Sequence, residues 1–373
     1  MADDRERLEQ LFQYQLDAGL HHGAQLAVYH DGENVLNLAG GTTGPDGDAL
    51  GPDDRMLFFS ATKPLTAACV HQLVERGDLA YDDRIVDHWP TFADADSPKA
   101  DVTVRHVLSH QGGFPYSPFD GSYDDWTEWE TVVEAMEDLT VHFEPGSTAA
   151  YHPMNYGWVL GELVRRVSGR EIGAYAREYV FEPLGMMETY IGLPDDVPDD
   201  VATLVAFDEF DRVRKPDGGL DSDHERSAQQ FNREAFHRAP MPAANGVGTA
   251  GNLARFYAAI SNGGRLGNTQ LLAESTVAEA TSVTAEVAED ATLGGPRRYA
   301  LGFVCAGTPH DNYGTLAPEQ TVGHAGLGSS VGWADPDADL AFAYVTNGIR
   351  DSYEHRARVN AMADAVRKVY ANG

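Results

Sequence analysis

Strand-like patterns lie near both ends of the chain, and helical patterns lie mostly between them. Runs of alternating or β-branched residues bounded by turn signals predict strands at 25–30, 34–39, 299–305, 329–334 and 340–346. Asp31-Gly32, between the first two runs, is a hairpin turn signal. Apolar residues at helical spacing predict helices over 4–18 and 351–370.

The middle of the chain is mostly helical and polar. One helix is predicted to begin at Ser60 and to end near Gly77, where glycine is a common terminator. Apolar periodicity predicts further helices at 102–109, 128–139, 156–167 and 252–261. Residues 208–238 are highly charged without a sustained apolar period, so we expect a polar surface flap there, with disorder as the alternative.

This order of elements predicts a mixed α/β (α+β) fold. Strands at both chain ends would pair in one antiparallel sheet flanked by helices. We expect a sheet domain made of residues 1–77 and 241–373, with a mostly helical lobe, 78–240, inserted between them.

Length and composition favour a soluble globular protein. The chain has 373 residues, 42% of them hydrophobic, which is enough for a full core. No apolar run reaches the roughly 18–20 residues that span a bilayer. The first residues are charged and lack the apolar segment of a signal peptide, so we expect a cytoplasmic location.

The net charge of -31 excludes some partners. Nucleic acids and anionic membranes attract clustered Lys and Arg, whereas this chain has 58 acidic and 27 basic residues. Its only lysines are Lys63, Lys99, Lys215 and Lys368. We interpret this composition as adaptation to high salt, with an acidic mesophilic enzyme as the alternative. Two cysteines are too few for a disulfide framework or a cysteine metal site.

The first candidate for chemistry is the stretch from Phe58 to Cys69, where an apolar run turns into a helix. Ser60 and Lys63 stand three residues apart, and side chains at that spacing lie on one helical face. Lys63 could therefore accept a proton from the Ser60 hydroxyl. The N–H groups at a helix start also point toward a developing anion. Ser-x-x-Lys alone occurs by chance, so the motif needs support from elsewhere in the chain.

Two further segments could supply that support. Tyr151 follows the turn signal Glu144-Pro145-Gly146, and a phenol beside a cation can ionise and serve as base and then acid. Residues 322–328 form a glycine-rich turn before a strand, where backbone N–H groups can bind an oxyanion. His324 in that turn adds a titratable donor. A packed tyrosine and a plain turn are the alternatives.

Together these motifs resemble the serine β-lactamase and penicillin-binding-protein superfamily, whose members carry Ser-x-x-Lys. The chain is most similar to class C β-lactamases and to the related family VIII carboxylesterases. Val107-Leu108-Ser109-His110-Gln111-Gly112-Gly113 is similar to the family's Leu-Leu-x-His-x-Ser-Gly segment. The resemblance covers roughly residues 25–347 and implies a β-lactamase/transpeptidase-like fold.

The resemblance implies specific roles for these residues. Ser60 would be the acylated nucleophile, and Lys63 and Tyr151 would share proton transfer. The N–H groups of Ser60 and Leu327 would form the oxyanion hole, and His324-Ala325-Gly326 would stand where the family has Lys-Thr-Gly. No metal or cofactor is implied.

Two departures from the family pattern favour an ester as the small-molecule substrate. Pro153 stands where β-lactamases have the asparagine of Tyr-x-Asn, and His324 replaces a lysine that helps to bind the substrate carboxylate. Both changes affect recognition of a carboxylate-bearing lactam rather than acyl transfer. We therefore expect an esterase for short or medium acyl chains. β-Lactamase or D-amino-acid peptidase activity is the alternative, and a non-catalytic binding protein is a further one, although Ser60, Lys63 and Tyr151 are all retained.

Two rival motifs are weaker. Gly328-Ser329-Ser330-Val331-Gly332 matches the Gly-x-Ser-x-Gly elbow, but that elbow needs a helix after its serine, and a strand-like run follows here. His106 and His110 have the spacing of a zinc-binding pair, but Val107 stands where the protease motif has Glu. We expect both histidines to have packing roles.

The acidic composition leads to a prediction about salt. Ions shorten the range of charge repulsion from about 10 Å at 0.1 M to about 3 Å at 1 M. We therefore expect the free energy of unfolding to rise from dilute buffer to molar KCl, as measured by urea denaturation. A protein equally stable without salt would contradict adaptation to high salt.

Overall fold

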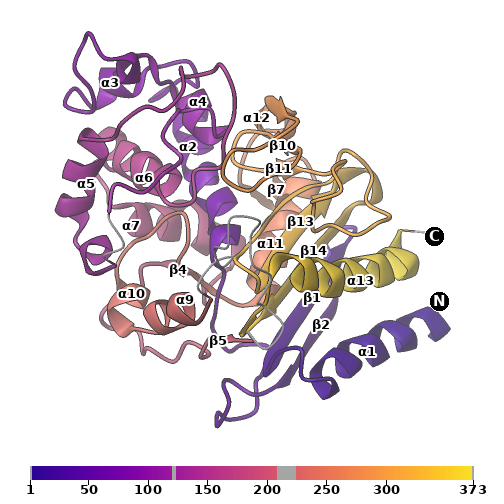
Figure 1. The fold of residues 1–373 in the computed structure, drawn as a ribbon. Coiled ribbons are helices and arrows are strands. Elements are labelled where there is room, and N and C mark those ends of the chain that lie inside the picture. The colour runs from indigo at the N-terminus through magenta and orange to yellow at the C-terminus, as the bar shows by residue number, and fades with distance from the viewer. Residues whose placement is uncertain (1, 120–122, 208–223, 372–373) are drawn as a thin grey trace.

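An eight-stranded antiparallel sheet brings the two ends of the chain together (Figure 1). The computed structural model describes residues 2–119, 123–207 and 224–371. In spatial order the strands are β2 (Glu33–Gly41), β1 (Gly23–His30), β14 (Leu340–Thr346), β13 (Ser330–Asp335), β12 (Val322–Ala325), β11 (Val304–Cys305), β10 (Arg297–Tyr299) and β9 (Ala285–Val287). N-terminal β1 pairs with C-terminal β14 in an unbroken register, which confirms the predicted sheet.

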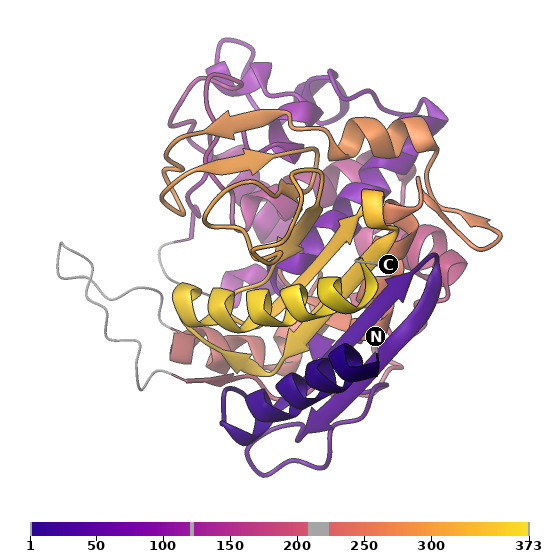
Figure 2. The same cartoon turned by 90° about the vertical axis from the view of Figure 1, so that its right-hand side faces the viewer.

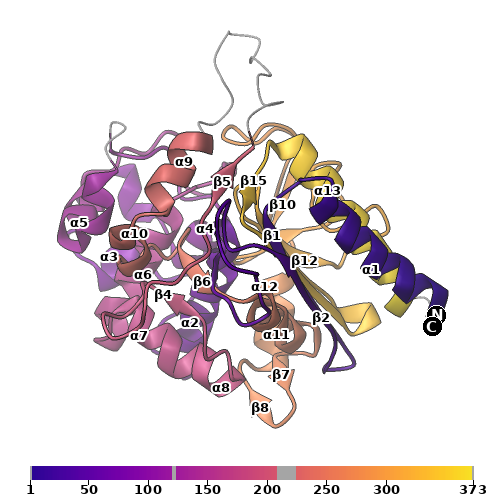
Figure 3. The same ribbon diagram turned by 90° about the horizontal axis from the view of Figure 1, so that it is seen from below.

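Helices cover both faces of this sheet. Helices α1 (Ala2–Asp17) and α13 (Ser352–Tyr370) lie side by side on the outer face (Figures 2 and 3). Alternate strand residues such as Leu26 and Phe342 pack against these two helices, while their neighbours face the opposite way. Helix α11 (Ala250–Ser261) packs on β1, β13 and β14 on the inner face.

Beyond α11 lies the helical region. Its elements are η1 (Ser60–Thr62), α2 (Lys63–Arg76), α3 (Ile85–His88), η2 (Pro98–Asp101), α4 (Val104–Leu108), η3 (Asp124–Thr127), α5 (Trp129–Glu137), α6 (Asn155–Ser168), α7 (Ile172–Ala176), the π-turn η4 (Arg177–Phe181), α8 (Glu182–Leu184), α9 (His224–Phe231), α10 (Glu234–Arg238) and α12 (Glu274–Thr281). One apolar core runs from the sheet's inner face into this region. Because this core is continuous, it does not mark a boundary between two domains. The predicted domain boundaries near residues 77 and 241 stay a prediction.

Short strands and one helical turn complete the description. They are β3 (Met56–Leu57), β4 (Tyr190–Ile191) and β6 (Gly246–Gly248) in one small sheet, β5 (Val205–Ala206) beside β15 (Gly348–Ile349), the hairpin β7 (Arg265–Leu266) and β8 (Thr269–Gln270), and η5 (Pro336–Ala338). Among the described residues, no helix is both long and apolar enough to cross a membrane.

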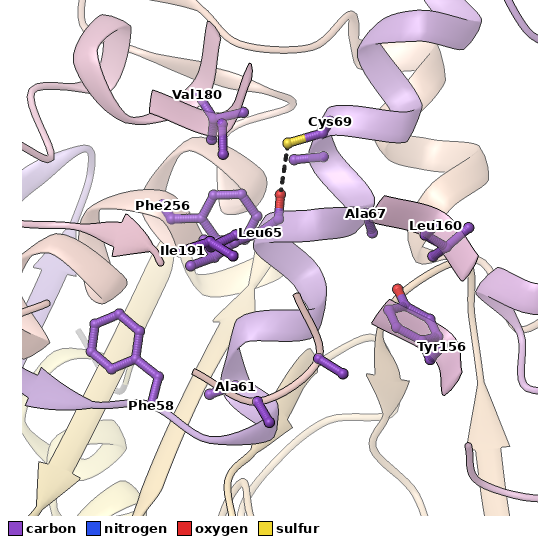
Figure 4. Close-up of a cluster of buried hydrophobic side chains, with 14 of the residues drawn as sticks. Phe58, Ala61, Leu65, Ala67, Cys69, Tyr156, Leu160, Val180, Ile191 and Phe256 are labelled. Atoms are coloured by element: carbon purple, nitrogen blue, oxygen red, sulfur yellow. Dashed lines mark hydrogen bonds between the residues drawn. The ribbon is translucent and has the colours of Figure 1, made fainter. Parts of the chain in front are cut away.

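Helix α2 runs through the middle of the core (Figure 4). Its side chains are buried from Lys63 to Leu73, as expected for a helix that is apolar nearly all round. Leu65 and Ala67 lie among side chains from α6, η4, β4 and α11. Gly77 ends the helix in a left-handed conformation, as predicted from the sequence. The segment that begins with Ser60 is thus fixed by packing on all sides.

Three local predictions were wrong. Residues 299–305 form the ends of two strands joined by a turn, with Gly302 at a φ of 93°, because the apolar run hides a reversal of direction. Residues 322–325 form strand β12, and the glycine turn begins only after them. Residues 224–238 form helices α9 and α10, which pack Phe231 and Phe236 into the core, whereas 208–223 of the predicted flap lie outside the described residues.

Candidate active site

Ser60 lies at a strained turn between β3 and α2. The residue before it, Phe59, has a φ of 45°, an uncommon conformation for a side chain of that size. Neighbouring chains fix this turn: Phe58 N–H donates to Gly246 O at 2.8 Å, and Ser330 Oγ donates to Phe58 O at 2.6 Å. Ser60 itself is partly exposed, whereas the residues after it are buried. The backbone thus presents one hydroxyl outward from a packed core.

The Lys63 amine lies next to that hydroxyl. Its Nζ is 3.2 Å from Ser60 Oγ, 2.7 Å from Pro153 O and 3.1 Å from Ala243 O. The side chain is fully buried, and burial lowers the pKa of Lys63 well below its usual range. A neutral amine has two N–H donors, which satisfy the two carbonyl groups. Its lone pair then faces Ser60 Oγ, ready to accept the serine proton.

Tyr151 is the third predicted residue that the fold brings to this point. The Lys63 Nζ lies 4.7 Å from the centre of the Tyr151 ring. Burial raises the pKa of Tyr151, and hydrogen bonding with Ser60 only partly offsets that shift. Burial thus favours the protonated phenol over the ionised one. The predicted role of Tyr151 in proton transfer stays a prediction.

Sequence reasoning missed the group that fixes the Tyr151 backbone. Asp290 Oδ2 accepts the Tyr151 N–H at 2.9 Å and the Tyr299 hydroxyl at 2.7 Å. Its Oδ1 accepts the N–H groups of Thr292 and Leu293, at 2.9 and 2.8 Å. Asp290 is 1% exposed, and these four protein donors provide hydrogen bonds to its buried oxygens. The sequence could indicate only the local turn at 290–293, because an aspartate often accepts hydrogen bonds from the N–H groups two and three residues further on. It carries no signal for the contact with Tyr151.

His324 lies on β12, facing the same site. Its Nδ1 is 2.8 Å from Ala325 O, and a carbonyl oxygen only accepts, so Nδ1 carries the proton. Within the described part of the chain, the buried Nε2 has no hydrogen-bond partner. Burial is the largest cause that lowers the pKa of His324, to about 3. The imidazole is therefore neutral at any ordinary pH and offers no cation to a substrate carboxylate.

The turn after β12 packs directly against the Ser60 segment. A Cβ at Gly326 would lie 2.3 Å from Phe58 O and 2.9 Å from Phe59 Cβ, so only glycine fits there. Across the described ranges, the N–H groups of Ser60 and Leu327 donate no hydrogen bond to the protein. Two free donors, one on each side of this contact, suit the oxyanion hole that the sequence predicted.

The rival motifs have structural roles. Ser330 lies within β13, and its hydroxyl is bound to Phe58 O, so it is no nucleophile elbow. His106 Nδ1 accepts the Thr103 N–H at the start of α4. His110 Nδ1 accepts the His152 N–H at 3.1 Å, and its ring lies 4.7 Å from the Tyr151 ring. In the described residues, no three His, Cys, Asp or Glu side chains are grouped to bind a metal ion.

Comparison with known proteins identifies the family of this chain. The model of the Beta-lactamase family matches residues 8–366. The esterase/beta-lactamase LipL of Mycobacterium tuberculosis is 33% identical over 343 residues, 87% of this chain and 77% of LipL.

Two solved structures superimpose over nearly the whole chain. A penicillin-binding protein homologue from Caulobacter crescentus has a TM-score of 0.82 and 31% identity, and it covers 97% of this chain and 98% of its own. A family VIII carboxylesterase has a TM-score of 0.83 and 28% identity, with 97% of each chain covered. The chain therefore belongs to the Beta-lactamase family, as a serine hydrolase with the β-lactamase/transpeptidase-like fold.

Proposed function

We propose that the protein is a serine carboxylesterase that hydrolyses neutral esters of short to medium acyl chains through an acyl-serine intermediate. The observation that carries this proposal is the neutral, buried His324 beside Ser60, Lys63 and Tyr151. Acyl transfer needs the last three residues, whereas recognition of a carboxylate would need a cation near position 324.

Acylation follows from the positions of Ser60 and Lys63. Ser60 Oγ attacks the ester carbonyl carbon while its proton passes to the lone pair of Lys63 Nζ, 3.2 Å away. The carbonyl oxygen becomes an oxyanion that accepts hydrogen bonds from the N–H groups of Ser60 and Leu327. The C–O bond to the alcohol then breaks, and the alcohol leaves with a proton relayed through Tyr151 from Lys63.

Deacylation reverses these roles with water as the nucleophile. Lys63, neutral again once the alcohol has its proton, accepts a proton from water as the water oxygen attacks the acyl carbon. The bond to Ser60 Oγ breaks, and Ser60 regains its proton through the same pair. The products are a carboxylic acid and the alcohol, and no other reactant is needed.

The residues around Tyr151 also favour an uncharged ester. Pro153 contributes only its carbonyl group, which Lys63 occupies. Asn155, two residues further on, does not replace the missing amide, because its Nδ2 donates to Phe114 O and Tyr116 O at 2.8 Å each. A lactam side chain would therefore find no amide donor at this position.

Lactam or D-amino-acid peptide hydrolysis is the alternative use of the same nucleophile. Its support is the shared serine chemistry and the relatives named as an esterase/beta-lactamase and as a penicillin-binding protein homologue. A parallel assay separates the two functions.

We predict turnover of p-nitrophenyl acetate and butyrate, with slower or no turnover of a chromogenic cephalosporin and a D-alanyl peptide. Ser60→Ala should lower kcat for the esters by about 10⁴-fold or more, because no acyl intermediate can form. Ester turnover that survives in Ser60→Ala, or rapid lactam turnover without ester turnover, would overturn the proposal. Ser168→Ala is the control, because it removes a partly exposed serine hydroxyl that is bonded within the end of α6, away from the reacting groups.

The pH dependence of kcat/KM tests whether Lys63 acts as a neutral amine. Lys63 acts while deprotonated, and its pKa is lowered, so the rate should rise with pH and level off well below the pKa of about 10.4 of a free lysine. Tyr151 acts while protonated, and its pKa is raised, so no decline is expected near the usual pKa of about 10. A rate that rises only through pH 10 would contradict a neutral Lys63. Lys63→Arg should lower kcat by about 10²- to 10⁴-fold.

Position 324 provides a test of substrate charge. His324→Lys adds a cation, so we expect the ratio of cephalosporin to ester kcat/KM to rise by about 10-fold, the value of one charge-assisted hydrogen bond. His324→Met removes the imidazole without adding charge and should leave the ratio unchanged. Equal ratios in both variants would show that the residue at 324 does not select against carboxylates.

A further inference from the structure

Arg358 lies on α13, on the outer face of the sheet, yet it contacts the turn after β12. Its side chain is 4% exposed. Nη2 donates to Gly328 O and to Gly348 O at 2.7 Å each, and to Thr346 Oγ1 at 3.0 Å. Nη1 donates to Leu20 O at 2.8 Å and to His21 Nδ1 at 3.2 Å. The guanidinium thus joins the N-terminal loop, two late strands and the turn.

The acceptors around Arg358 are all neutral. Within residues 2–119, 123–207 and 224–371 it forms no ion pair, whereas Arg350 pairs with Glu354, and Arg367 with Asp335. Burial lowers the pKa of Arg358 to about 10, so it still carries its charge at neutral pH. A buried charge without a partner is costly, and an apolar side chain of similar length would avoid that cost. A contribution to the free energy of unfolding therefore does not explain this arginine. The groups that accept its hydrogen bonds indicate its role instead.

The Gly328 carbonyl group is fixed from two directions. Besides Arg358, the Arg350 N–H donates to Gly328 O at 3.0 Å. Gly328 has a φ of 54°, and a Cβ there would lie 2.1 Å from Arg350 O. The turn thus rests directly on the chain at 350, and Arg358 secures it there.

The other end of the turn is fixed against the nucleophile segment. Gly326 N–H donates to Ser330 O at 2.8 Å, and a Cβ at Gly326 would collide with Phe58 O and Phe59 Cβ. Leu327 lies between these two fixed glycines. The direction of its N–H is therefore set by the contacts of Gly326 on one side and of Gly328 on the other.

We propose that Arg358 is a positioning residue for acyl transfer, which holds the Leu327 N–H in place to bind the oxyanion. This inference rests on the proposed function. Arg358 acts from behind the sheet and does not touch the substrate, because its Nη groups are already bonded to the protein. An N–H that is fixed before reaction needs no reorganisation as charge develops, so loosening it weakens binding of the transition state more than binding of the substrate.

The test compares Arg358→Met and Arg358→Lys with a control on the same helix. Arg356→Met is that control, because Arg356 donates to Pro309 O and His310 Nδ1 rather than to the turn. The concentration of active enzyme is counted with a p-nitrophenyl phosphonate, which phosphonylates Ser60 Oγ and releases p-nitrophenol, so a smaller folded fraction does not lower the measured kcat. Each variant is assayed with p-nitrophenyl butyrate, and its affinity for a boronic acid that mimics the tetrahedral intermediate is measured.

We expect Arg358→Met to lower kcat by about 10- to 100-fold and to change KM by less than about twofold. This fall in kcat is somewhat smaller than the fall expected from removing a whole oxyanion donor. Boronate affinity should fall by the same factor as kcat/KM. Arg358→Lys should recover part of the loss, and Arg356→Met should match the unmodified protein.

Wild-type kcat in titrated Arg358→Met, or a fall in kcat without a fall in boronate affinity, would overturn the inference. If the methionine variant does not fold, the lysine variant decides by the same two measurements. Failure of the proposed function is distinguishable, since it shows as ester turnover that is absent or that survives in Ser60→Ala. Turnover that depends on Ser60 but not on Arg358 refutes this inference alone.

Discussion

The burial of one amine without a counter-ion sets the electrostatics of the candidate site. Lys63 Nζ contacts Ser60 Oγ and the carbonyl oxygens of Pro153 and Ala243, and none of these is charged. An ammonium would lose its hydration there without gaining a carboxylate, so the neutral amine is favoured. The three groups come from three separate parts of the chain. The surroundings that favour the neutral amine therefore form only once the helical region and the sheet have packed together.

Burial also favours the neutral forms of the histidines and of the tyrosine in the candidate site. Burial lowers the pKa of His110, His152 and His324 and raises that of Tyr151. In such surroundings, fixed N–H donors interact more strongly with a developing oxyanion than they would in water. A substrate that brings its own carboxylate would have to be desolvated without a partner. The excess of acidic residues in the composition thus contrasts with the histidines and the tyrosine near Ser60, whose neutral forms burial favours.

The parts of the site that sequence could predict are those set by local spacing. The separation of Ser60 and Lys63 on one helix, and the small residues around Gly326, follow from the order of residues alone. The protonation of Tyr151 does not, because it depends on burial by distant segments. Asp290, which binds the Tyr151 N–H, lies 139 residues further along the chain. No periodicity connects two such positions, so only the folded structure shows the contact.

The sequence predicted those elements of the fold that have a regular local pattern of apolar residues. The paired strands β1 and β2 and the helices α1, α6 and α13 have regular apolar periods, and they lie where those periods place them. The reversal at Gly302 and the two helices after residue 223 were missed. In the first, an apolar run continues through a turn, and in the second, charged residues surround a few buried aromatic ones such as Phe231. In both cases contacts with the core decide the conformation, and local pattern does not report them.

The topology explains why a residue behind the sheet is able to influence the reaction. Because β1 from the N-terminal end pairs with β14 near the C-terminal end, Leu20 and Gly348 lie close enough to share one guanidinium. The same guanidinium reaches Gly328, one residue from the Leu327 N–H. Packing of α13 on the outer face and placement of that N–H near Ser60 are therefore parts of one structure. A substitution at Arg358 should then alter the rate through geometry, even though no atom of α13 is needed to touch the substrate.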